Sequence, residues 1–211
     1  MSFDTLAPVY RGMEAVLAGN ILQRCRETFL PRMTACRRAL ILGEGPGRFL
    51  SALLRANPGI EATCIERSPR MIGQARKNLA RLGLDLNRVE FINADVRTWA
   101  PLRNGYDLVA THFFLDCFKQ DELESLIVKT SAAATETATW VVSDFCLPDR
   151  GWRRVRAKLV LASMYAFFRV VAGLSAKSLT PPDPFLCGAG FRLAGRHHFN
   201  HGLVQSDLWL R

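Results

Sequence analysis

A glycine-rich loop is the feature of the sequence that best fits ligand chemistry. The glycines alternate in Gly43-Glu44-Gly45-Pro46-Gly47, directly after an apolar run and before an amphipathic one. Glycine lets the backbone approach a ligand closely, and open α/β sheets bind ligands beside the carboxyl ends of their strands. The spacing therefore predicts a cofactor-binding loop with Gly43, Glu44, Gly45 and Gly47 as contacting residues.

Two acidic residues follow the next two apolar runs. Glu66 comes after residues 62–65, where an acid can accept hydrogen bonds from ribose hydroxyls. Asp95 comes shortly after residues 89–92, a position suited to an amine such as that of adenine. With the glycine loop, these acids predict an adenosine-shaped site along one edge of a sheet.

The loop chemistry favours one adenosine cofactor over another. A dinucleotide fingerprint places a third glycine where this chain has Arg48. Glu44 suits a cationic ligand better than a pyrophosphate, and S-adenosylmethionine (SAM) carries a sulfonium and an ammonium. We therefore expect SAM, and a nicotinamide-dependent oxidoreductase is the disfavoured alternative.

The elements that must position these residues alternate between strands and helices. Strand-like apolar runs are expected at 39–42, 62–65, 89–92, 106–110 and 140–145. Between them, helices are expected around 49–54, from Ser68 as N-cap to Gly83, and from about Asp121. This order predicts an α/β fold, a Rossmann-like and mostly parallel sheet with helices on both faces.

The helices show apolar faces at helical spacing, which predicts the side that each one buries. The expected buried residues are Phe49, Leu50, Leu53 and Leu54; Ile72, Ala75, Leu79 and Leu82; and Leu123, Leu126, Ile127 and Thr130.

The last third departs from this alternation. Residues 152–174 have a helical pattern, 180–184 form a proline-rich loop, and 191–193 and 203–210 suggest a C-terminal antiparallel hairpin. We expect residues 1–211 to be one domain, comprising an N-terminal helical cap (1–34), a cofactor-binding core (35–147) and an apolar helix or lid with the hairpin (148–211).

Residues 35–147 resemble the class I SAM-dependent methyltransferases. The resemblance rests on four segments: Ala39-Leu40-Ile41-Leu42-Gly43-Glu44-Gly45-Pro46-Gly47, Glu66-Arg67-Ser68-Pro69-Arg70-Met71, Asn93-Ala94-Asp95-Val96 and Tyr106-Asp107-Leu108-Val109. The resemblance implies that Arg67 and Val96 also contact SAM. The chain has Ile41 where the family usually places an acid, and Glu44 is the substitute for the ammonium contact.

Residues 3–10 are similar to the N-terminal segment of quinone-type methyltransferases, which closes over the cofactor. The similarity implies a cofactor contact from Tyr10. Those enzymes usually have an aspartate after the tyrosine, where this chain has Arg11.

Two residues after the fourth strand are candidates for a general base. His112 and Asp116 lie in Thr111-His112-Phe113-Phe114-Leu115-Asp116, where a methyl acceptor would sit. The alternative interpretation is that His112 lines the cofactor pocket and Asp116 caps a turn. The segment lacks the Asn/Asp-Pro-Pro-Tyr run of nucleic-acid amino-methylating enzymes, so a nucleic-acid substrate is not expected.

The net charge and one apolar run indicate which partners the protein could bind. The net charge is +9, with arginines concentrated at 24–38, 67–81 and 150–158. The apolar run 159–174 is too short and too interrupted by Arg169 for a comfortable membrane span. It is either a core helix or a hydrophobic lid over an apolar acceptor, with peripheral contact to an anionic membrane.

Cysteine usage and the first residues predict a cytoplasmic protein. The six cysteines form no C-x-x-C pair and mostly lie in apolar runs, as expected of reduced thiols. No signal-peptide pattern precedes the core. His197, His198 and His201 are expected on a solvent-facing strand and turn, and no metal site is expected.

The expected function is SAM-dependent methyl transfer (EC 2.1.1) to a small, hydrophobic, quinone- or lipid-like acceptor. Two alternatives stay open, a SAM-binding protein without transfer activity and an RNA methyltransferase that the charge alone suggests.

Overall fold

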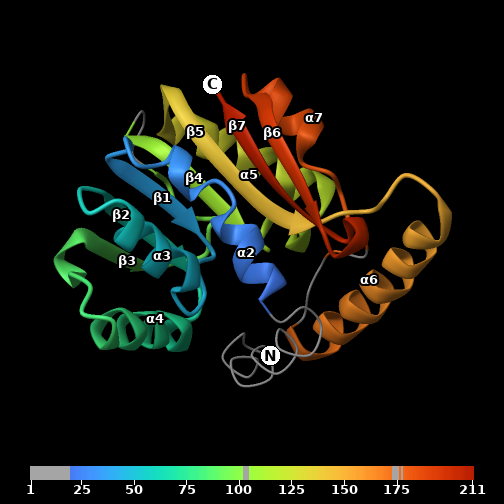
Figure 1. The fold of residues 1–211 in the computed structure, drawn as a ribbon, viewed down its shortest axis with the longest axis horizontal. Helices are drawn as coiled ribbons and strands as arrows, with labels where there is room; N and C mark the ends of the chain where they lie inside the picture. Colours follow the sequence, from blue (N-terminus) through green and yellow to red (C-terminus); the bar gives the residue numbers. More distant parts are fainter. Residues whose placement is uncertain (1–19, 102–104, 173–175, 177) are drawn as a thin grey trace.

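A single seven-stranded sheet organises the chain. The computed structural model describes residues 20–101, 105–172, 176 and 178–211, and its strands have the order β3-β2-β1-β4-β5-β7-β6 (Figure 1). The strands are β1 (Arg38–Leu42), β2 (Glu61–Glu66), β3 (Val89–Asn93), β4 (Tyr106–His112), β5 (Ala134–Phe145), β6 (Arg192–Phe199) and β7 (Val204–Leu210). Pairs among β1 to β5 are parallel, whereas β7 is antiparallel to both β5 and β6. The predicted Rossmann-like sheet with an antiparallel hairpin is confirmed.

The interior strand β1 shows why the sheet carries helices on both faces. Ala39 and Ile41 belong to one buried cluster and Leu40 and Leu42 to another, and all four side chains are at most 1% exposed. Successive side chains of a strand point to opposite faces, so a continuous apolar run needs cover on both sides.

One layer contains α2 (Ile21–Glu27), α3 (Arg48–Ala56) and α4 (Pro69–Arg81), with the short 3-10 turns η2 (Leu30–Arg32) and η3 (Leu86–Arg88). The expected face of α3 is buried in full. On α4, Ser68 caps the helix by accepting from the Met71 N–H, as predicted, and Met71 is buried. Leu82 is instead 38% exposed, because the chain leaves the helix there towards Gly83.

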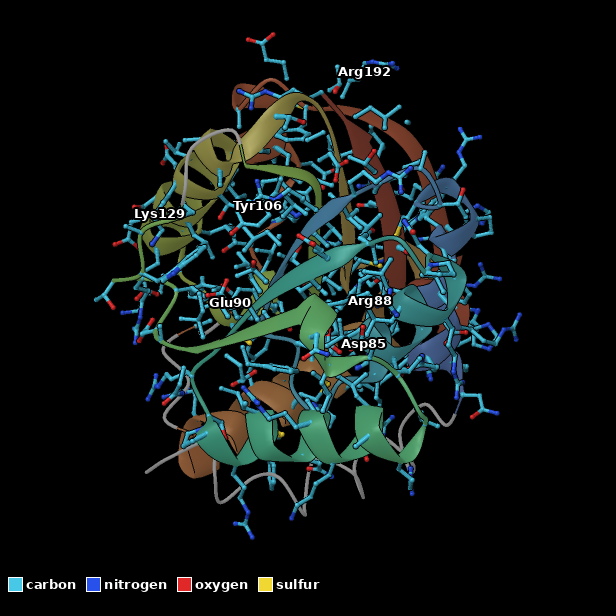
Figure 2. The ribbon with its side chains drawn as sticks, turned by 90° about the vertical axis from the view of Figure 1, so that its left-hand side faces the viewer. Asp85, Arg88, Glu90, Tyr106, Lys129 and Arg192 are labelled. Carbon is cyan, nitrogen blue, oxygen red and sulfur yellow. The ribbon has the colours of Figure 1, made fainter. Side chains whose placement is uncertain are left out.

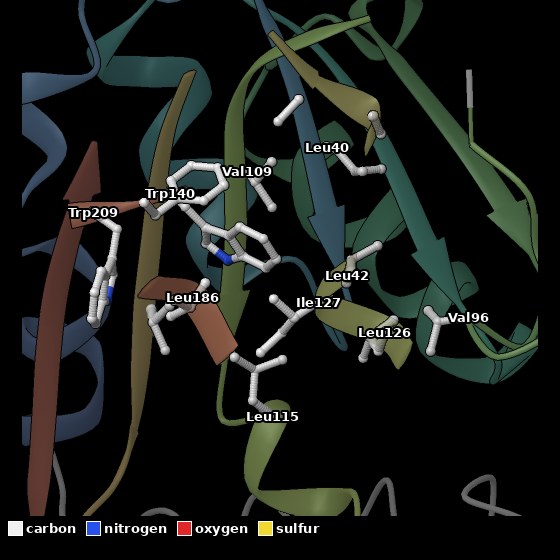
Figure 3. Close-up of a cluster of buried hydrophobic side chains, with 14 of the residues drawn as sticks. Leu40, Leu42, Val96, Val109, Leu115, Leu126, Ile127, Trp140, Leu186 and Trp209 are labelled. Carbon is white, nitrogen blue, oxygen red and sulfur yellow. The ribbon is translucent and has the colours of Figure 1, made fainter. Parts of the chain in front are cut away.

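The other layer contains α5 (Gln120–Ala133), which follows η4 (Leu115–Cys117), and α7 (Asp183–Gly188). Figure 3 shows their apolar side chains meeting the sheet around Trp140, which is fully buried. Leu126 and Ile127 of α5 and Leu186 of α7 belong to this cluster. The predicted buried face of α5 is confirmed.

Helix α6 (Gly151–Ala172) belongs to neither layer. Figure 1 shows it beside the carboxyl ends of the parallel strands. Leu161 and Tyr165 on its inner face join a third buried cluster with Leu22 of α2 and Leu203, which follows η5 (Asn200–Gly202). The helix is therefore packed against the body of the protein along one face.

Three expected boundaries were wrong. Strand β5 begins at Ala134, not near Trp140, because α5 ends at Ala133 and passes directly into the strand. The proline-rich segment forms helix α7 from Asp183, and β6 runs on to Phe199. Short proline-initiated helices and edge strands carry little periodic signal, which explains these differences.

The two edges of the sheet differ in character. In Figure 2 the β3 edge faces the viewer, with Arg88 before the strand and Glu90 on it. Arg88 fastens this edge by donating to the Pro58 carbonyl at 2.8 Å. At the opposite edge, Arg196 of β6 pairs with Asp207 of β7 and Asp183 of α7, each at 2.7 Å.

Among the described residues, no helix has the length and hydropathy of a membrane span, and no group of histidines, cysteines and acids is arranged as a metal site. The cysteines are free thiols; Cys25, Cys64 and Cys146 are buried as expected, whereas Cys187 is exposed.

Candidate active site

The predicted glycine loop joins β1 to α3, and all three of its glycines need positive φ. The angles are +68° at Gly43, +64° at Gly45 and +84° at Gly47, a region that side chains strongly disfavour. A Cβ at Gly43 would overlap the ring of Phe114, whereas one at Gly45 would meet no heavy atom within 4 Å. The loop therefore packs against Phe114 at Gly43 and leaves space for a ligand beside the backbone at Gly45.

Glu66 ties this loop to the neighbouring strand. Its Oε2 accepts from the Gly45 N–H at 3.0 Å, and its Oε1 accepts from the Ser68 N–H at 2.8 Å. Each carboxylate oxygen has two acceptor positions, so these bonds leave capacity for the hydroxyls of a ligand. The order of the strands places Glu66 at the end of β2, directly beside the end of β1.

Asp95 lies two residues beyond the end of β3 and is held by arginines. Arg97 donates to both carboxylate oxygens, the shortest distance being 2.6 Å, and Arg67 lies 3.8 Å away. The hydrogen bonds from Arg97 hold the pKa of Asp95 at about 2, so the carboxylate is ionised. Val96 is buried beside it, and its carbonyl accepts from Lys129 of α5. Sequence reasoning missed Arg97.

The carboxylate of Glu44 turns towards the start of α3. Its Oε1 accepts from the Leu50 N–H at 3.1 Å, which satisfies an otherwise unpaired donor of the first helical turn. Burial raises the pKa of Glu44 to about 7, although Leu50 and the charge of Arg26 act in the opposite direction. A ligand ammonium near this group would favour its ionised form.

His112 is the last residue of β4, and its imidazole ring makes no hydrogen bond to the described residues. The ring is 8% exposed and lies 4.2 Å from the Phe49 ring, centroid to centroid. Neither ring nitrogen has a hydrogen-bond partner among the described residues. Burial, aided by the charge of Arg26, lowers the pKa of His112 well below its usual value, so the ring is neutral. An unsatisfied buried nitrogen at this edge fits a site completed by a ligand.

A pair of buried carboxyl groups joins η4, which follows β4, to the carboxyl end of strand β5. The Asp116 N–H donates to Oδ2 of Asp144 at 3.1 Å, and the two carboxyl groups hydrogen-bond to each other. Burial and mutual repulsion raise the pKa of Asp144 well above its usual value, and burial also raises that of Asp116. Two adjacent carboxylates repel each other, so the pair binds a proton more tightly than an isolated carboxyl group does.

Helix α6 reaches this carboxyl pair. The Tyr165 hydroxyl donates to the Asp116 carbonyl at 3.2 Å, and Tyr165 is 6% exposed. Sequence reasoning named Asp116 but missed Asp144 and Tyr165. Asp144 lies in the strand run that sequence reasoning predicted, near its carboxyl end, and the strand-end argument used for Glu66 would have found it.

Aromatic side chains stand at the same edge. Phe113 and Phe145 follow or end neighbouring strands, and their rings lie 5.5 Å apart in an edge-to-face arrangement. Phe113 has a φ of +54°, which is unusual for a bulky residue, and its N–H donates to the Ser143 carbonyl at 2.6 Å. Arg26 of α2 stacks over Phe113 at 4.8 Å from the ring centroid.

The structure therefore brings most of the predicted residues to one edge. Glu66 and His112 end β2 and β4, and Gly43 directly follows β1, which lies between them. Asp95 lies beyond the end of β3 and Asp116 beyond the end of β4. Tyr10 lies outside the described residues. The open backbone at Gly45, the acids and the unpartnered imidazole fit an adenosine cofactor with a cationic end.

Several solved structures with this fold are methyltransferases. The mitomycin 7-O-methyltransferase MmcR is 21% identical, with a TM-score of 0.72 over 100% of this chain and 61% of its own. An O-methyltransferase family 2 protein from Planctomyces limnophilus, in complex with apigenin, is 16% identical, with a TM-score of 0.74 over 100% of this chain and 62% of its own. An O-methyltransferase family protein from Burkholderia thailandensis is 17% identical, with a TM-score of 0.72 over 97% of this chain and 59% of its own.

The chain thus spans about three fifths of the length of these structures. No curated protein matches it by sequence. A family model described as a methyltransferase domain matches residues 39–136, the segment that contains the glycine loop, Glu66, Asp95 and His112. Residues 39–136 thus match a methyltransferase domain within a fold shared with SAM-dependent methyltransferases, and this match implies S-adenosylmethionine as the cofactor.

Proposed function

We propose that the protein transfers a methyl group from SAM to a hydroxyl group of a small, hydrophobic acceptor, quinone- or lipid-like in character. The observation that carries this proposal is the buried Asp116–Asp144 pair at the carboxyl edge of the sheet. A hydroxyl acceptor must lose a proton as it is methylated, and a carboxyl pair holding a single proton can accept another.

In this proposal the cofactor occupies the edge from β3 to β1. Gly43, Gly45 and Gly47 let the backbone approach it, and Glu66 receives the ribose hydroxyls. Asp95, Val96 and Arg67 surround the adenine, and the carboxylate of Glu44 pairs with the ammonium group of SAM. Tyr10 would contribute from the N-terminal segment. When bound, SAM supplies an electrophilic methyl group on its sulfonium.

The acceptor side is assigned to β4, β5 and α6. Phe113 and Phe145 offer an apolar, aromatic surface for the acceptor. The acceptor oxygen forms a bond to the methyl carbon while the carbon–sulfur bond breaks, and the hydroxyl proton passes to a carboxylate oxygen of Asp116. Asp144 holds the shared proton and orients Asp116, and neutral His112 accepts a hydrogen bond. Residues 1–211 act as one domain in which 148–211 serve the acceptor.

The test is a methyl-transfer assay with labelled SAM. Purified protein is offered matched phenols, thiols and amines over a range of hydrophobicity, and products are identified by mass spectrometry. Methyl ethers formed preferentially from apolar phenols would support the proposal. Transfer to amines alone would contradict it, and no transfer with intact binding of the demethylated cofactor would indicate a SAM-binding protein without activity.

A further inference from the structure

The outer face of α6 carries apolar side chains into solvent. Trp152 and Val155 are each 61% exposed and Leu159 is 67% exposed. Their spacing of three and four residues places them on one face, which Ala162 and Ala166 continue as exposed residues. We call this face the α6 stripe. The other large exposed apolar residues among those described stand singly, on different parts of the chain: Leu82, Val128 and Leu193.

The charged side chains of α6 itself all have one sign. Helix α6 contains five arginines and lysines and no acidic residue, and no acid occurs anywhere between Arg150 and Pro182. Arg153, Lys158 and Arg169 are exposed and flank the stripe at helical spacing. The stripe is therefore an apolar strip with cations on its sides.

The opposite face fixes α6 to the protein, so the stripe is a stable outward surface. Ala157, Leu161 and Met164 are at most 7% exposed within the third buried cluster. Arg156 also donates to Oδ1 of Asn200 at 3.0 Å, which ties the helix to the turn η5. Figure 1 shows the helix lying along the outside of the body.

We propose that the α6 stripe docks on an anionic membrane surface, with Trp152, Val155 and Leu159 entering the headgroup boundary. A helix lying in the interface plane buries apolar side chains there while flanking Lys and Arg side chains meet anionic lipid headgroups. A second copy of the chain fits less well, because an isologous contact would bring the cations of one copy against those of the other. The proposal concerns a binding surface and does not depend on methyl transfer.

The experiment is co-sedimentation of the full chain with large vesicles of phosphatidylcholine, alone or with phosphatidylglycerol. Binding is expected for the anionic vesicles and is expected to weaken as salt is raised. Removing one deeply placed apolar side chain, as in Leu159→Ser, is expected to weaken the partition about tenfold, and Lys158→Glu to weaken it on anionic vesicles. Val128→Ser on α5, at 60% exposure, is the matched apolar control, and Lys77→Glu on α4 is the charge control.

Trp152 provides a direct readout of depth. Trp140 and Trp209 are at most 1% exposed, and Trp99 is partly buried against the first hydrophobic cluster, away from α6. Quenching by brominated lipid acyl chains is therefore expected to come mainly from Trp152, and the part due to Trp152 is the part lost in Trp152→Ser. Equal binding by wild type and Leu159→Ser would overturn the proposal. So would a concentration-dependent dimer lost in Leu159→Ser without vesicle binding. Loss of methyl transfer with vesicle binding intact would contradict only the proposed function.

Discussion

The backbone N–H of Asp116 donates to the carboxylate of Asp144 at 3.1 Å, which joins the turn after β4 to the end of the neighbouring strand β5, 28 residues further along the chain. Both side chains are buried, at 7% and 3% exposure. Burial of two acids is costly unless they share a proton or meet a ligand, and this cost is the reason that we propose the pair as the acceptor side of the site.

Asp116→Asn is expected to lower kcat about 100-fold, as loss of a general base does, while binding of the demethylated cofactor changes little. In the wild type, the raised pKa of the pair predicts that activity falls as pH falls and the second proton is taken up. Rate against pH, measured for wild type and variant, checks both points. Asp121→Asn, an exposed change on α5, is the control, and equal rates for both variants would contradict the assignment.

Glu66→Gln is expected to weaken binding of the demethylated cofactor about tenfold or more. The carboxylate of Glu66 can accept hydrogen bonds from ribose hydroxyls through both oxygens, whereas the NH2 group of a glutamine only donates. Isothermal calorimetry measures the change. Glu90→Gln on the adjacent strand β3 is the matched control at an exposed position, labelled in Figure 2. Identical affinities for the two variants would remove Glu66 from the cofactor site.

Gly43→Ala and Gly45→Ala separate packing from binding. Both add a Cβ at positive φ, which costs about 1 kcal/mol, but only Gly43→Ala also collides with the Phe114 ring. We expect a large loss of unfolding free energy for Gly43→Ala and a small one for Gly45→Ala, which instead loses cofactor affinity. Urea unfolding and calorimetry check the pair. Gly73→Ala on α4, where a Cβ meets nothing, is the control and is expected to stabilise slightly.

Glu44→Gln is expected to change the dependence of stability on pH. The folded-state pKa of Glu44 is raised to about 7, so the folded protein binds the proton more tightly than the unfolded chain does. The protonated Glu44 contributes about 3 kcal/mol to the free energy of unfolding at low pH. This contribution is lost as the pH rises from the pKa of Glu44 in the unfolded chain towards its folded-state pKa of about 7. Relative to wild type, the variant should gain stability between pH 5 and pH 8. Exposed Glu124→Gln should show no such gain.

The sequence predicted the parallel core because its signals are local. Gly43, Ser68 and Glu66 each stand where a strand or helix must begin or end, and periodic apolar residues fix the elements between them. What could not be predicted depends on distant contacts. The Asp116–Asp144 pair exists only because β4 and β5 are neighbours, and Arg97 is recognisable only by its bonds to Asp95. The sequence left open whether α6 is a core helix or a lid with membrane contact, because only the packing of its inner face shows which apolar side chains stay in solvent.

The place of β7 in the sheet constrains the order in which the protein assembles. Strand β6 pairs with β7 and β7 pairs with β5, so the earlier strand of the hairpin has no place on the sheet until the later one has been synthesised. Until then the edge of β5 presents unpaired backbone groups, including those of Val141 and Ser143. Such a late, non-local pairing slows folding and leaves a nascent chain exposed to aggregation on the ribosome. The proposed acceptor side, which borders this edge, is then completed last.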